Sequence, residues 1–296
     1  MKSGVVAIVG RPNVGKSTLF NRVTGSKISI ISRHPATTRL KILGLINRDQ
    51  GQVLLLDTPG FELPRHQLGE FMKKTVLSSL TEADLALFVI SAGGWKEEDE
   101  ELLEEVKRLN KKALLIINKI DILSRKEDLL PLIENSRQRY NFLEIYPCSA
   151  LHQEKWDTLV KIIFQWLPEG EVFFPVGQVS NLAREYLLAE ILREKILEKT
   201  YEEVPHSVAV EIEDICPGKT NPEMVVIYAS IIVDRKQIKP IILGRNGERI
   251  KAIGQKARLE MEQLLGRPVY LQTKVKVIPD WRDRPDVFRR FGYGQF

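Results

Sequence analysis

Residues 10–17 carry the pattern of a phosphate-binding loop, because Gly10 and Gly15 enclose four residues and are followed at once by Lys16 and Ser17. Glycines let a backbone approach phosphate groups closely, so that successive N–H groups point at the anion. Lys16 would reach the β- and γ-phosphates of a nucleotide, and the Ser17 hydroxyl would bind Mg²⁺. The residues that we expect to hold the phosphates are Gly10, Asn13, Val14, Gly15, Lys16, Ser17 and Thr18.

The segments on either side are those that such a loop needs. The apolar run Val5–Val9 predicts a buried strand, and Thr18–Val23 predicts the first turns of a helix. A strand that leads through a glycine-rich loop into a helix places the positive end of the helix dipole at the phosphates. A glycine-rich turn with an incidental Lys-Ser pair is the alternative, and the two flanking segments argue against it.

Two threonines and a D-x-P-G turn supply groups that could complete a metal site. Thr37 and Thr38 lie in the polar segment 33–39, where a loop could bring a hydroxyl to the metal, although adjacent threonines are common in loops. Asp57 ends an apolar run, and the carboxyl end of a buried strand is where α/β sheets bind ligands. Asp57 would hold a water of Mg²⁺, and the N–H of Gly60 would contact the γ-phosphate; an ordinary turn is the alternative.

Phe61 follows this turn, at the place where Ras-like switches carry a glutamine that orients the attacking water. A phenyl ring has neither a donor nor an acceptor for that task. We therefore expect slow intrinsic hydrolysis, or a water that is positioned by backbone groups, a cation or a partner.

A later N-K-x-D motif, Asn118 to Asp121, predicts which base is bound. The Asp121 carboxylate can accept hydrogen bonds from N1–H and the exocyclic amine of guanine, and adenine offers neither donor there. Asn118 would connect the base loop to the phosphate loop, and the stem of Lys119 would lie over the base. The motif therefore favours GTP over ATP. The guanine-binding candidates are Asn118, Lys119 and Asp121, with Ser149, Ala150 and Leu151 from the end of a later strand, where backbone N–H groups would contact the base.

Apolar and amphipathic segments alternate through the first 170 residues, as in α/β proteins. Further buried strands are expected at 83–90, 113–117 and 144–151, and helices at 68–80, 97–110, 127–139 and 154–166. One apolar strand after each helix indicates a mostly parallel sheet with helices on both faces. The acidic run within 97–110 is interpreted as the solvated face of its helix. We place a nucleotide-binding α/β domain at residues 1–170.

A second domain is expected after a linker. Periodicity stops at residues 171–180, which contain proline and glycine, and Phe173 and Phe174 would hold this linker against one domain. Residues 181–280 then predict the order α-β-β-α-α-β. The expected elements are helix 181–200, strands 206–213 and 224–233, a short helix at 239–243, helix 248–265 and strand 269–278.

A G-x-x-G loop, Gly244 to Gly247, joins two helices of this second domain. KH domains use such a loop to clamp about four nucleotides of a single strand, because glycines let the two backbones come close. With this element order and its basic surroundings we expect an α+β, KH-type fold; a helix–turn–helix corner in a structural domain is the alternative. The RNA-binding candidates are Gly244, Arg245, Asn246, Gly247, Arg249 and Lys251.

Charge is distributed unevenly along the chain. Residues 235–296 hold 15 Lys+Arg and 6 Asp+Glu, whereas residues 1–234 have a net charge of −4 within the total of +5. A basic end is expected of a nucleic-acid-binding region, although a solvated basic surface would look the same. The last stretch, 281–296, mixes arginines with aromatic residues and could either stack on bases or pack back on the sheet.

Composition favours an ordinary globular protein. No apolar run is long enough to span a bilayer, and the chain enters a predicted strand almost at once, so we expect no signal peptide. Cys148 and Cys216 lie far apart without metal-ligand spacing, and the four histidines are scattered. These cysteines are expected to be plain thiols of a reducing compartment.

In combination, these residues resemble the Era family of bacterial ribosome-assembly GTPases over essentially the whole chain. The motifs that carry the resemblance lie at 10–17, 35–39, 57–60, 118–121, 149–151 and 244–247. Each motif occurs in many GTPases, but the pairing of one such domain with one type II KH domain is specific. A related family with two tandem GTPase domains is excluded, because the chain has one phosphate loop.

The resemblance implies GTP hydrolysis coupled to binding of the 3′ end of small-subunit (16S) ribosomal RNA, in maturation of the 30S subunit. It also implies a cytoplasmic monomer with peripheral contact to the inner membrane. By matching position, Thr38 is the expected switch ligand of Mg²⁺ and Thr37 the alternative, and Lys16, Thr38 and Gly60 are the expected catalytic residues. Asn13 matches a residue that helps bind K⁺ in related GTPases, where the ion supplies the charge of an arginine finger.

Other functions remain possible from the sequence. The chain could be a GTPase that regulates a protein or membrane partner, with the KH-like module as a docking domain. It could also be chiefly an RNA-binding assembly chaperone that uses very slow hydrolysis as a timer. RNA binding by the G-x-x-G loop would separate the first of these from a GTPase whose hydrolysis is coupled to RNA binding.

Overall fold

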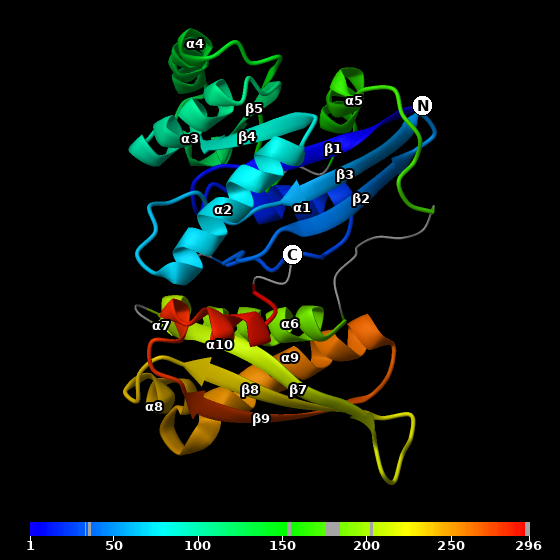
Figure 1. The fold of residues 1–296 in the computed structure, drawn as a ribbon, viewed down its shortest axis with the longest axis vertical. Coiled ribbons are helices and arrows are strands. Elements are labelled where there is room, and N and C mark those ends of the chain that lie inside the picture. The colour runs from blue at the N-terminus through cyan, green and yellow to red at the C-terminus, as the bar shows by residue number, and fades with distance from the viewer. Residues whose placement is uncertain (33, 35–36, 153–154, 176–183, 202–203, 294–296) are drawn as a thin grey trace. The chain divides into compact units, whose positions relative to one another are not determined.

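The computed structural model of the chain describes residues 1–32, 34, 37–152, 155–175, 184–201 and 204–293 (Figure 1). The chain divides into two compact units. The N-terminal unit comprises Met1–Ile31, Thr38–Arg65 and Gly69–Asn181, and the C-terminal unit comprises Ser32–Thr37, His66–Leu68 and Leu182–Phe296. Each unit contains its own sheet.

A six-stranded sheet, in the order β2-β3-β1-β4-β5-β6, forms the centre of the N-terminal unit. Its strands are β1 (Lys2–Val9), β2 (Ile42–Arg48), β3 (Gly51–Asp57), β4 (Leu85–Ser91), β5 (Ala113–Asn118) and β6 (Ile145–Pro147). β2 pairs antiparallel with β3, and the other neighbours pair parallel. Every residue of β3, β4 and β5 is buried, as expected for strands covered on both faces.

Helices cover both faces of this sheet. They are α1 (Lys16–Thr24), α2 (Gln67–Glu82), α3 (Glu97–Arg108), α4 (Leu129–Arg139) and α5 (Asp157–Trp166). Val76 of α2, Leu102 of α3 and Ile133 of α4 join Ala7 and Val9 of β1 in one apolar cluster. α1 packs against β1, β2 and β3, and Figure 1 shows it across the sheet from α2. The mostly parallel α/β architecture is the one that the sequence predicts.

The strand order determines where the motifs meet. β1 lies between β3 and β4, so that consecutive crossovers leave it in opposite directions. The carboxyl ends of the parallel strands lie at one edge, and such a switch point is where open α/β sheets bind ligands. The loops after β1, β3, β5 and β6 therefore come together at that edge.

The C-terminal unit has a three-stranded sheet in the order β7-β8-β9. Its elements are α6 (Arg184–Lys199), α7 (Val204–Ser207), β7 (Val208–Pro217), β8 (Val225–Val233), α8 (Ile238–Leu243), α9 (Glu248–Leu265), β9 (Val269–Val277) and α10 (Pro285–Arg290). β7 is antiparallel to β8, and β8 is parallel to β9. α8 and α9 connect the parallel pair, and α6 packs against α9 and β7. Apart from the one-turn α7 and α10, which follows β9, this is the predicted α-β-β-α-α-β order.

Two expected strands differ most from the structure at their C-terminal ends. The strand expected at 206–213 begins only at Val208, because the preceding residues form α7, and it continues to Pro217 past a β-bulge at Glu213. The strand expected at 144–151 is confined to β6. It ends at Pro147, whose missing N–H cannot extend a ladder, and the following residues form a loop.

Residues 171–175 of the expected linker contact the N-terminal unit through their backbone. The N–H groups of Phe173 and Phe174 donate to Oε1 of Gln52 at 2.9 and 3.0 Å, and Nε2 of Gln52 donates to the Phe174 carbonyl at 2.9 Å. The Phe173 ring is not the main anchor, since half of this residue is exposed. Residues 176–180 of this linker lie outside the described part of the chain.

None of the described helices is long and apolar enough to cross a membrane. Across the described ranges, no group of three or more His, Cys, Asp or Glu side chains could hold a metal ion. Cys148 is buried, Cys216 is partly exposed, and both are free thiols.

The sequence left two roles open for residues 281–296; residues 281–293 pack within the C-terminal unit, and 294–296 lie outside the described residues. Trp281 is fully buried, and its indole N–H donates to the carbonyl of Ser207 at 2.9 Å. Its ring meets Phe291 edge-on at 5.7 Å and stacks on Tyr293 at 6.5 Å. This segment is therefore part of the folded unit rather than a separate tail.

Replacing Trp281 with alanine is expected to destabilise the C-terminal unit by about 3–5 kcal/mol, because it leaves a cavity and an unpaired carbonyl. Hydrogen exchange followed by mass spectrometry should show faster exchange in β7 and β8 and unchanged exchange in β1 and β4. Tyr270→Ala is the control, because Tyr270 is 53% exposed and its loss should change stability by no more than about 0.5 kcal/mol. Equal exchange in the two variants would show that Trp281 does not support the fold.

Candidate functional site

The loop between β1 and α1 requires glycine at two positions. Gly10 has φ 158°, and a Cβ there would collide with the carbonyl oxygen of Val89. Gly15 has φ 96°, and a Cβ there would collide with the side-chain amide of Asn118. Both residues have positive φ and no space for a side chain, which explains why the pattern needs glycine. Of the other predicted phosphate-binding residues, Asn13 and Val14 lie within this loop, and Lys16, Ser17 and Thr18 lie in the first turn of α1.

Lys16 is folded back over this loop. Its Nζ donates to the carbonyls of Gly10 and Arg11, each at 2.9 Å. Burial lowers the pKa of Lys16 to about 8, although the nearby Asp57 carboxylate opposes the shift. A buried cation in a glycine-rich loop that opens a helix is suited to an anion as highly charged as a triphosphate.

An oxygen cluster lies beside Lys16 at the end of β3. The hydroxyls of Ser17 and Thr38 are 2.8 Å apart. The carboxylate of Asp57 is fully buried, and its Oδ1 has no hydrogen-bond partner among the described residues. Burial raises the pKa of Asp57, while the nearby Ser17 hydroxyl, the hydrogen bond from Ser29 and the charge of Lys16 oppose that shift. These groups fit Mg²⁺, which prefers oxygen ligands and would complement the unpartnered carboxylate oxygen.

Thr37, the alternative to Thr38, is placed differently. Its hydroxyl donates to the carbonyl of His34 at 2.7 Å, within its own loop. The structure thus brings Thr38 but not Thr37 to Ser17. Pro35 and Ala36, which precede them in the motif, lie outside the described residues.

Two residues that the sequence analysis did not single out support this cluster. The hydroxyl of Ser29 donates to Oδ2 of Asp57 at 2.8 Å. The Asn21 side chain holds the segment that carries Ser29, since its Oδ1 accepts from the N–H groups of Ile28 and Ser29 at 3.0 and 2.9 Å. No motif spacing points to either residue, because each acts through a contact between segments that fold together.

Gly60 and Phe61 are positioned by the phosphate loop. The N–H of Phe61 donates to the carbonyl of Gly10 at 3.1 Å. A Cβ on Gly60 would lie 2.6 Å from the ring of Pro12, so only glycine allows this approach. The Phe61 ring is 2% exposed and belongs to the apolar cluster under α2. Phe61 is therefore a core residue, which agrees with its inability to orient water.

Asn118 connects the phosphate loop with the expected base loop. Its Nδ2 donates to the carbonyl of Val14 at 2.7 Å, and its Oδ1 accepts from the N–H of Ala150 at 2.9 Å. Asn118 is 2% exposed, so these bonds are shielded from water. One side chain thus determines the spacing between the two loops.

The other guanine candidates surround an exposed carboxylate. The Ser149 hydroxyl donates to Asp121, which orients that side chain. Lys119 has a left-handed φ of 62°, and burial, followed by the nearby Arg11 guanidinium, lowers its pKa. The carbonyl of Leu151 accepts from Arg22 of α1 at 3.1 Å. The loops after β5 and β6 are therefore joined to each other and to α1.

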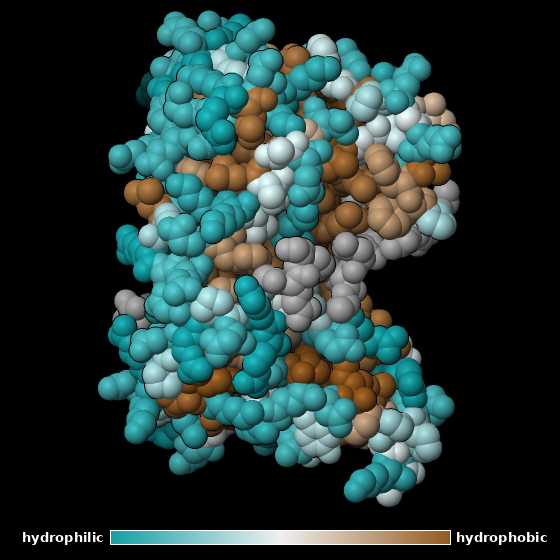
Figure 2. All heavy atoms as spheres, viewed as in Figure 1, coloured by the Kyte–Doolittle hydropathy of each residue, from teal (hydrophilic) through white to brown (hydrophobic). Residues whose placement is uncertain are grey.

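The acidic helix α3 corrects one sequence interpretation. Figure 2 shows hydrophilic residues over α3 and α4, at the upper left of the view, as expected for a solvated face. Asp99 is an exception, because it is fully buried. Its Oδ2 accepts from Nε of Arg11 at 3.0 Å, and this ion pair explains how a carboxylate is tolerated there.

The G-x-x-G loop lies between α8 and α9 in the C-terminal unit. Gly244 has φ 73° and ψ 177°, and a Cβ there would lie 2.6 Å from that of Arg249. Gly247 has φ 78° with open space around it. Arg249 donates to the carbonyl of Ile241, which ties α9 to α8. In the described part of the chain Arg245 and Lys251 form no ion pair; both are exposed, as is Asn246.

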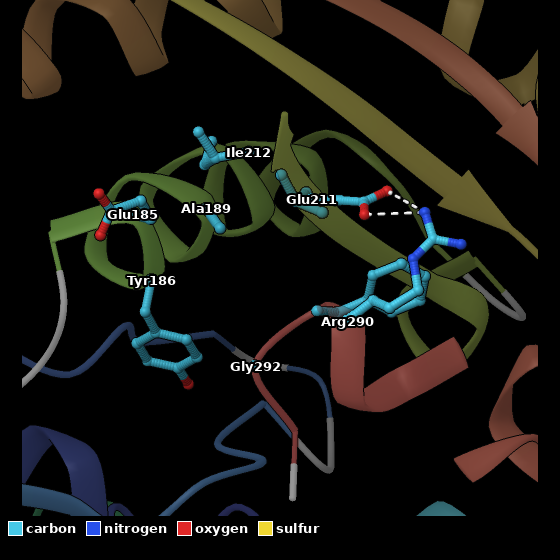
Figure 3. A pocket seen from close by; sticks show the side chains of 9 residues that line it. Glu185, Tyr186, Ala189, Glu211, Ile212, Arg290 and Gly292 are labelled. Atoms are coloured by element: carbon cyan, nitrogen blue, oxygen red, sulfur yellow. Dashed lines mark hydrogen bonds and ion pairs between the residues drawn. The ribbon is translucent and has the colours of Figure 1, made fainter. Parts of the chain in front are cut away.

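A cavity of about 220 Å³ lies elsewhere in the C-terminal unit (Figure 3). Glu211 of β7 and Arg290 of α10 form an ion pair of 3.0 Å at one side of it, and Glu185, Tyr186 and Ala189 of α6 line it further along. Its described lining includes no residue of the phosphate loop or of the G-x-x-G loop. We do not assign it to either predicted site.

Two protein-family models match the chain. The one described as a 50S ribosome-binding GTPase matches residues 5–119, and the one described as a KH domain matches residues 203–282. Together with the fold and the loop geometry, these matches define the class of the protein as a GTPase with a phosphate loop and a C-terminal KH domain.

Relatives cover the whole chain. GTPase Era of Aquifex aeolicus is 50% identical over 299 residues, with 99% of both chains covered, and GTPase Era of Carboxydothermus hydrogenoformans is 44% identical, with 100% of this chain and 99% of the relative covered. Two crystal structures match with TM-scores of 0.96 at 49% identity and 99% coverage of each chain. One is a variant of Aquifex aeolicus Era bound to GDP·AlF4⁻, and the other is Era with MgGDPNP and nucleotides 1506–1542 of 16S ribosomal RNA.

The chain belongs to the Era family of GTPases. The predicted resemblance, fold class and GTPase activity are thereby confirmed.

Proposed function

We propose that this chain is a GTP-driven switch that binds the single-stranded 3′ end of small-subunit ribosomal RNA and acts in maturation of the 30S subunit. The observation that carries the proposal is the presence of a nucleotide site and a G-x-x-G loop in one chain. The full-length similarity to Era in complex with MgGDPNP and 16S nucleotides 1506–1542 supports it. The family model whose description names the 50S subunit matches residues 5–119 and does not extend to the KH domain.

The proposed domain boundaries are those expected from the sequence, with one change. Residues 1–170 form the GTPase domain, 171–180 the linker and 181–280 the KH domain. The matched family models at 5–119 and 203–282 support this division. Residues 281–293 are added to the KH domain, because Trp281 is buried in it.

The loop after β1 is the proposed phosphate site, and the loops after β5 and β6 are the proposed guanine site. The Asp121 carboxylate would accept from N1–H and the amine of guanine, and the Ser149 hydroxyl keeps it oriented. Lys119 would cover the base. The backbone N–H groups of Ser149 and Ala150 would contact the base, although that of Ala150 donates to Oδ1 of Asn118 here, and Leu151 completes the proposed guanine site. Asp121→Asn should therefore shift preference from guanosine towards xanthosine nucleotides.

Mg²⁺ would be held by Ser17 and Thr38, and by Asp57 through a water. Bound Mg²⁺ supplies positive charge to the β- and γ-phosphates. Lys16, released from its carbonyl partners, would neutralise the same oxygens, and the N–H of Gly60 would bond to the γ-phosphate. These contacts make Lys16, Thr38 and Gly60 the proposed catalytic residues, all acting through charge and position rather than covalent chemistry.

Because Phe61 can neither supply positive charge nor orient the attacking water, other groups would have to do both. Asn13 is exposed, with a left-handed φ of 61°, and is the proposed K⁺ ligand by its match to potassium-activated GTPases. Comparing hydrolysis in potassium and sodium salts tests this assignment, and equal rates would remove it.

The proposed location is the cytoplasm, with peripheral contact to the inner membrane. This part rests on the resemblance alone. Co-sedimentation with vesicles of anionic lipid tests the membrane contact, and protein that stays in the supernatant would remove it from the proposal.

The two adjacent threonines provide a matched pair for testing the metal site. Thr38→Ala should lower kcat for GTP at least tenfold, because one contact to a charged centre is worth about 1.5–3 kcal/mol. Its affinity for GDP should stay near wild type, since the switch threonine acts only when the γ-phosphate is present. Thr37→Ala should hydrolyse GTP at close to the wild-type rate. The reverse ranking would move the assignment to Thr37.

The RNA-binding half is tested with a short single-stranded RNA that copies the 3′ end of 16S ribosomal RNA. Binding should be at least about fivefold tighter with a non-hydrolysable GTP analogue than with GDP, since coupling between two sites is typically 1–3 kcal/mol. The measurement is made at two salt concentrations, because non-specific binding falls steeply with salt.

Gly247→Asp and Gly247→Asn form the control pair for this experiment. Both side chains tolerate the left-handed backbone and have space, and they differ by one negative charge. The Asp variant should bind RNA about tenfold more weakly than the Asn variant, with GTP turnover unchanged in both. RNA affinity that is equal and weak in both nucleotide states would leave a GTPase whose KH domain serves another purpose.

A further inference from the structure

Asp99 is a buried charge that the assigned nucleotide motifs do not use. It lies in the first turn of α3 and is 0% exposed, whereas Glu97 in the same turn is exposed. A carboxylate without water requires charged or hydrogen-bonding partners in the protein. Its Oδ2 accepts from Nε of Arg11 at 3.0 Å and from the N–H of Lys96 at 3.1 Å, and its Oδ1 has no partner among the described residues. Arg11 is therefore the cation that makes this burial possible.

The partner of Asp99 is part of the phosphate loop. The carbonyl of Arg11 accepts from Nζ of Lys16, so the residue fixed by Asp99 also contacts the lysine that is proposed to reach the phosphates. The Arg11 side chain is 15% exposed, which limits competition from water. A movement of Arg11 would therefore move the backbone at the mouth of the loop.

Two side chains from outside the phosphate loop each bond to one half of it. Asn118 of β5 bonds to the carbonyl of Val14 in the second half of the loop. Asp99 of α3 bonds to the side chain of Arg11 in the first half. The Asn118 contact follows from the guanine motif, whereas no spacing in the sequence indicates the Asp99 contact.

We propose that Asp99 is a positioning residue for nucleotide binding, which holds the phosphate loop in its binding conformation through Arg11. The inference rests on the proposed phosphate site. A loop that departs from this conformation binds the ground state and the transition state less well by the same amount, so KM should rise while kcat changes little. A merely structural role gives the opposite signature, because partial unfolding lowers the active fraction and hence the apparent kcat at constant KM.

The test compares Asp99→Asn, Arg11→Gln and the double variant with Glu97→Gln as the matched control. Asp99→Asn keeps the size of the side chain and an acceptor for the Lys96 N–H but removes the ion pair. Glu97→Gln removes the same charge from the same helical turn at an exposed position. We expect each single variant to raise KM for GTP and Kd for GDP about tenfold with kcat within twofold of wild type, and Glu97→Gln to match wild type.

The double variant and Arg11→Lys complete the design. If Asp99 acts through Arg11, the double variant should lose about as much affinity as either single variant, and Arg11→Lys should recover part of the loss. An additive loss of about a hundredfold, a lowered kcat at constant KM, or a Kd for GDP within twofold of wild type in Asp99→Asn would each overturn the proposal. If either single variant does not fold, the double variant decides, because it removes both charges and leaves neither buried without its partner, and wild-type affinity in the double variant would also overturn the proposal. Failure of the proposed site itself would look different, since the wild-type protein would then bind no GDP.

Discussion

The burial of the Asp57 carboxylate is the constraint on which the nucleotide site depends. A charge removed from water costs several kcal/mol unless opposite charge or hydrogen bonds compensate for it. Here the Ser29 hydroxyl and the nearby Lys16 provide part of that compensation, and one carboxylate oxygen remains without a described partner. The end of β3, the start of α1 and the segment that carries Thr38 converge on this point. Their convergence forms the proposed site for a metal-bound phosphate group at the edge of the sheet.

The need of buried polar groups for partners also fixes the loops around Asp57. Buried polar side chains, rather than apolar packing, determine the distances between them: Asn118 joins the phosphate and base loops, and Asp99 joins the phosphate loop to α3. A loop held by a few directional bonds can adopt a second arrangement when a ligand replaces one of them. In the C-terminal unit the conformation of the G-x-x-G loop is constrained sterically, because the backbone at Gly244 leaves no space for a side chain.

Much of this could be predicted from the sequence, because continuous apolar runs and short motifs report local structure directly. Residues 10–17 and 118–121 predict their loops, and the helix at 248–265 has the expected bounds. Contacts between distant segments could not be predicted. Asp99 looks like one more solvated acid in an acidic helix, and Ser29 looks like an ordinary loop serine; only the fold shows that one meets Arg11 and the other Asp57. Trp281 likewise could have stacked on a base, and its burial depends on tertiary packing that composition does not report.

The most direct test of this account is the Mg²⁺ dependence of nucleotide affinity in wild type and in Asp57→Asn. Calorimetric titration of a non-hydrolysable GTP analogue, with Mg²⁺ and with a chelator, measures it without a contribution from hydrolysis. If the oxygens of Ser17, Thr38 and Asp57 form the metal site, Mg²⁺ should tighten binding to the wild-type protein at least tenfold, and Asp57→Asn should lose most of that gain. Equal affinity with and without Mg²⁺, or an unchanged Mg²⁺ effect in the variant, would contradict the central role of this carboxylate.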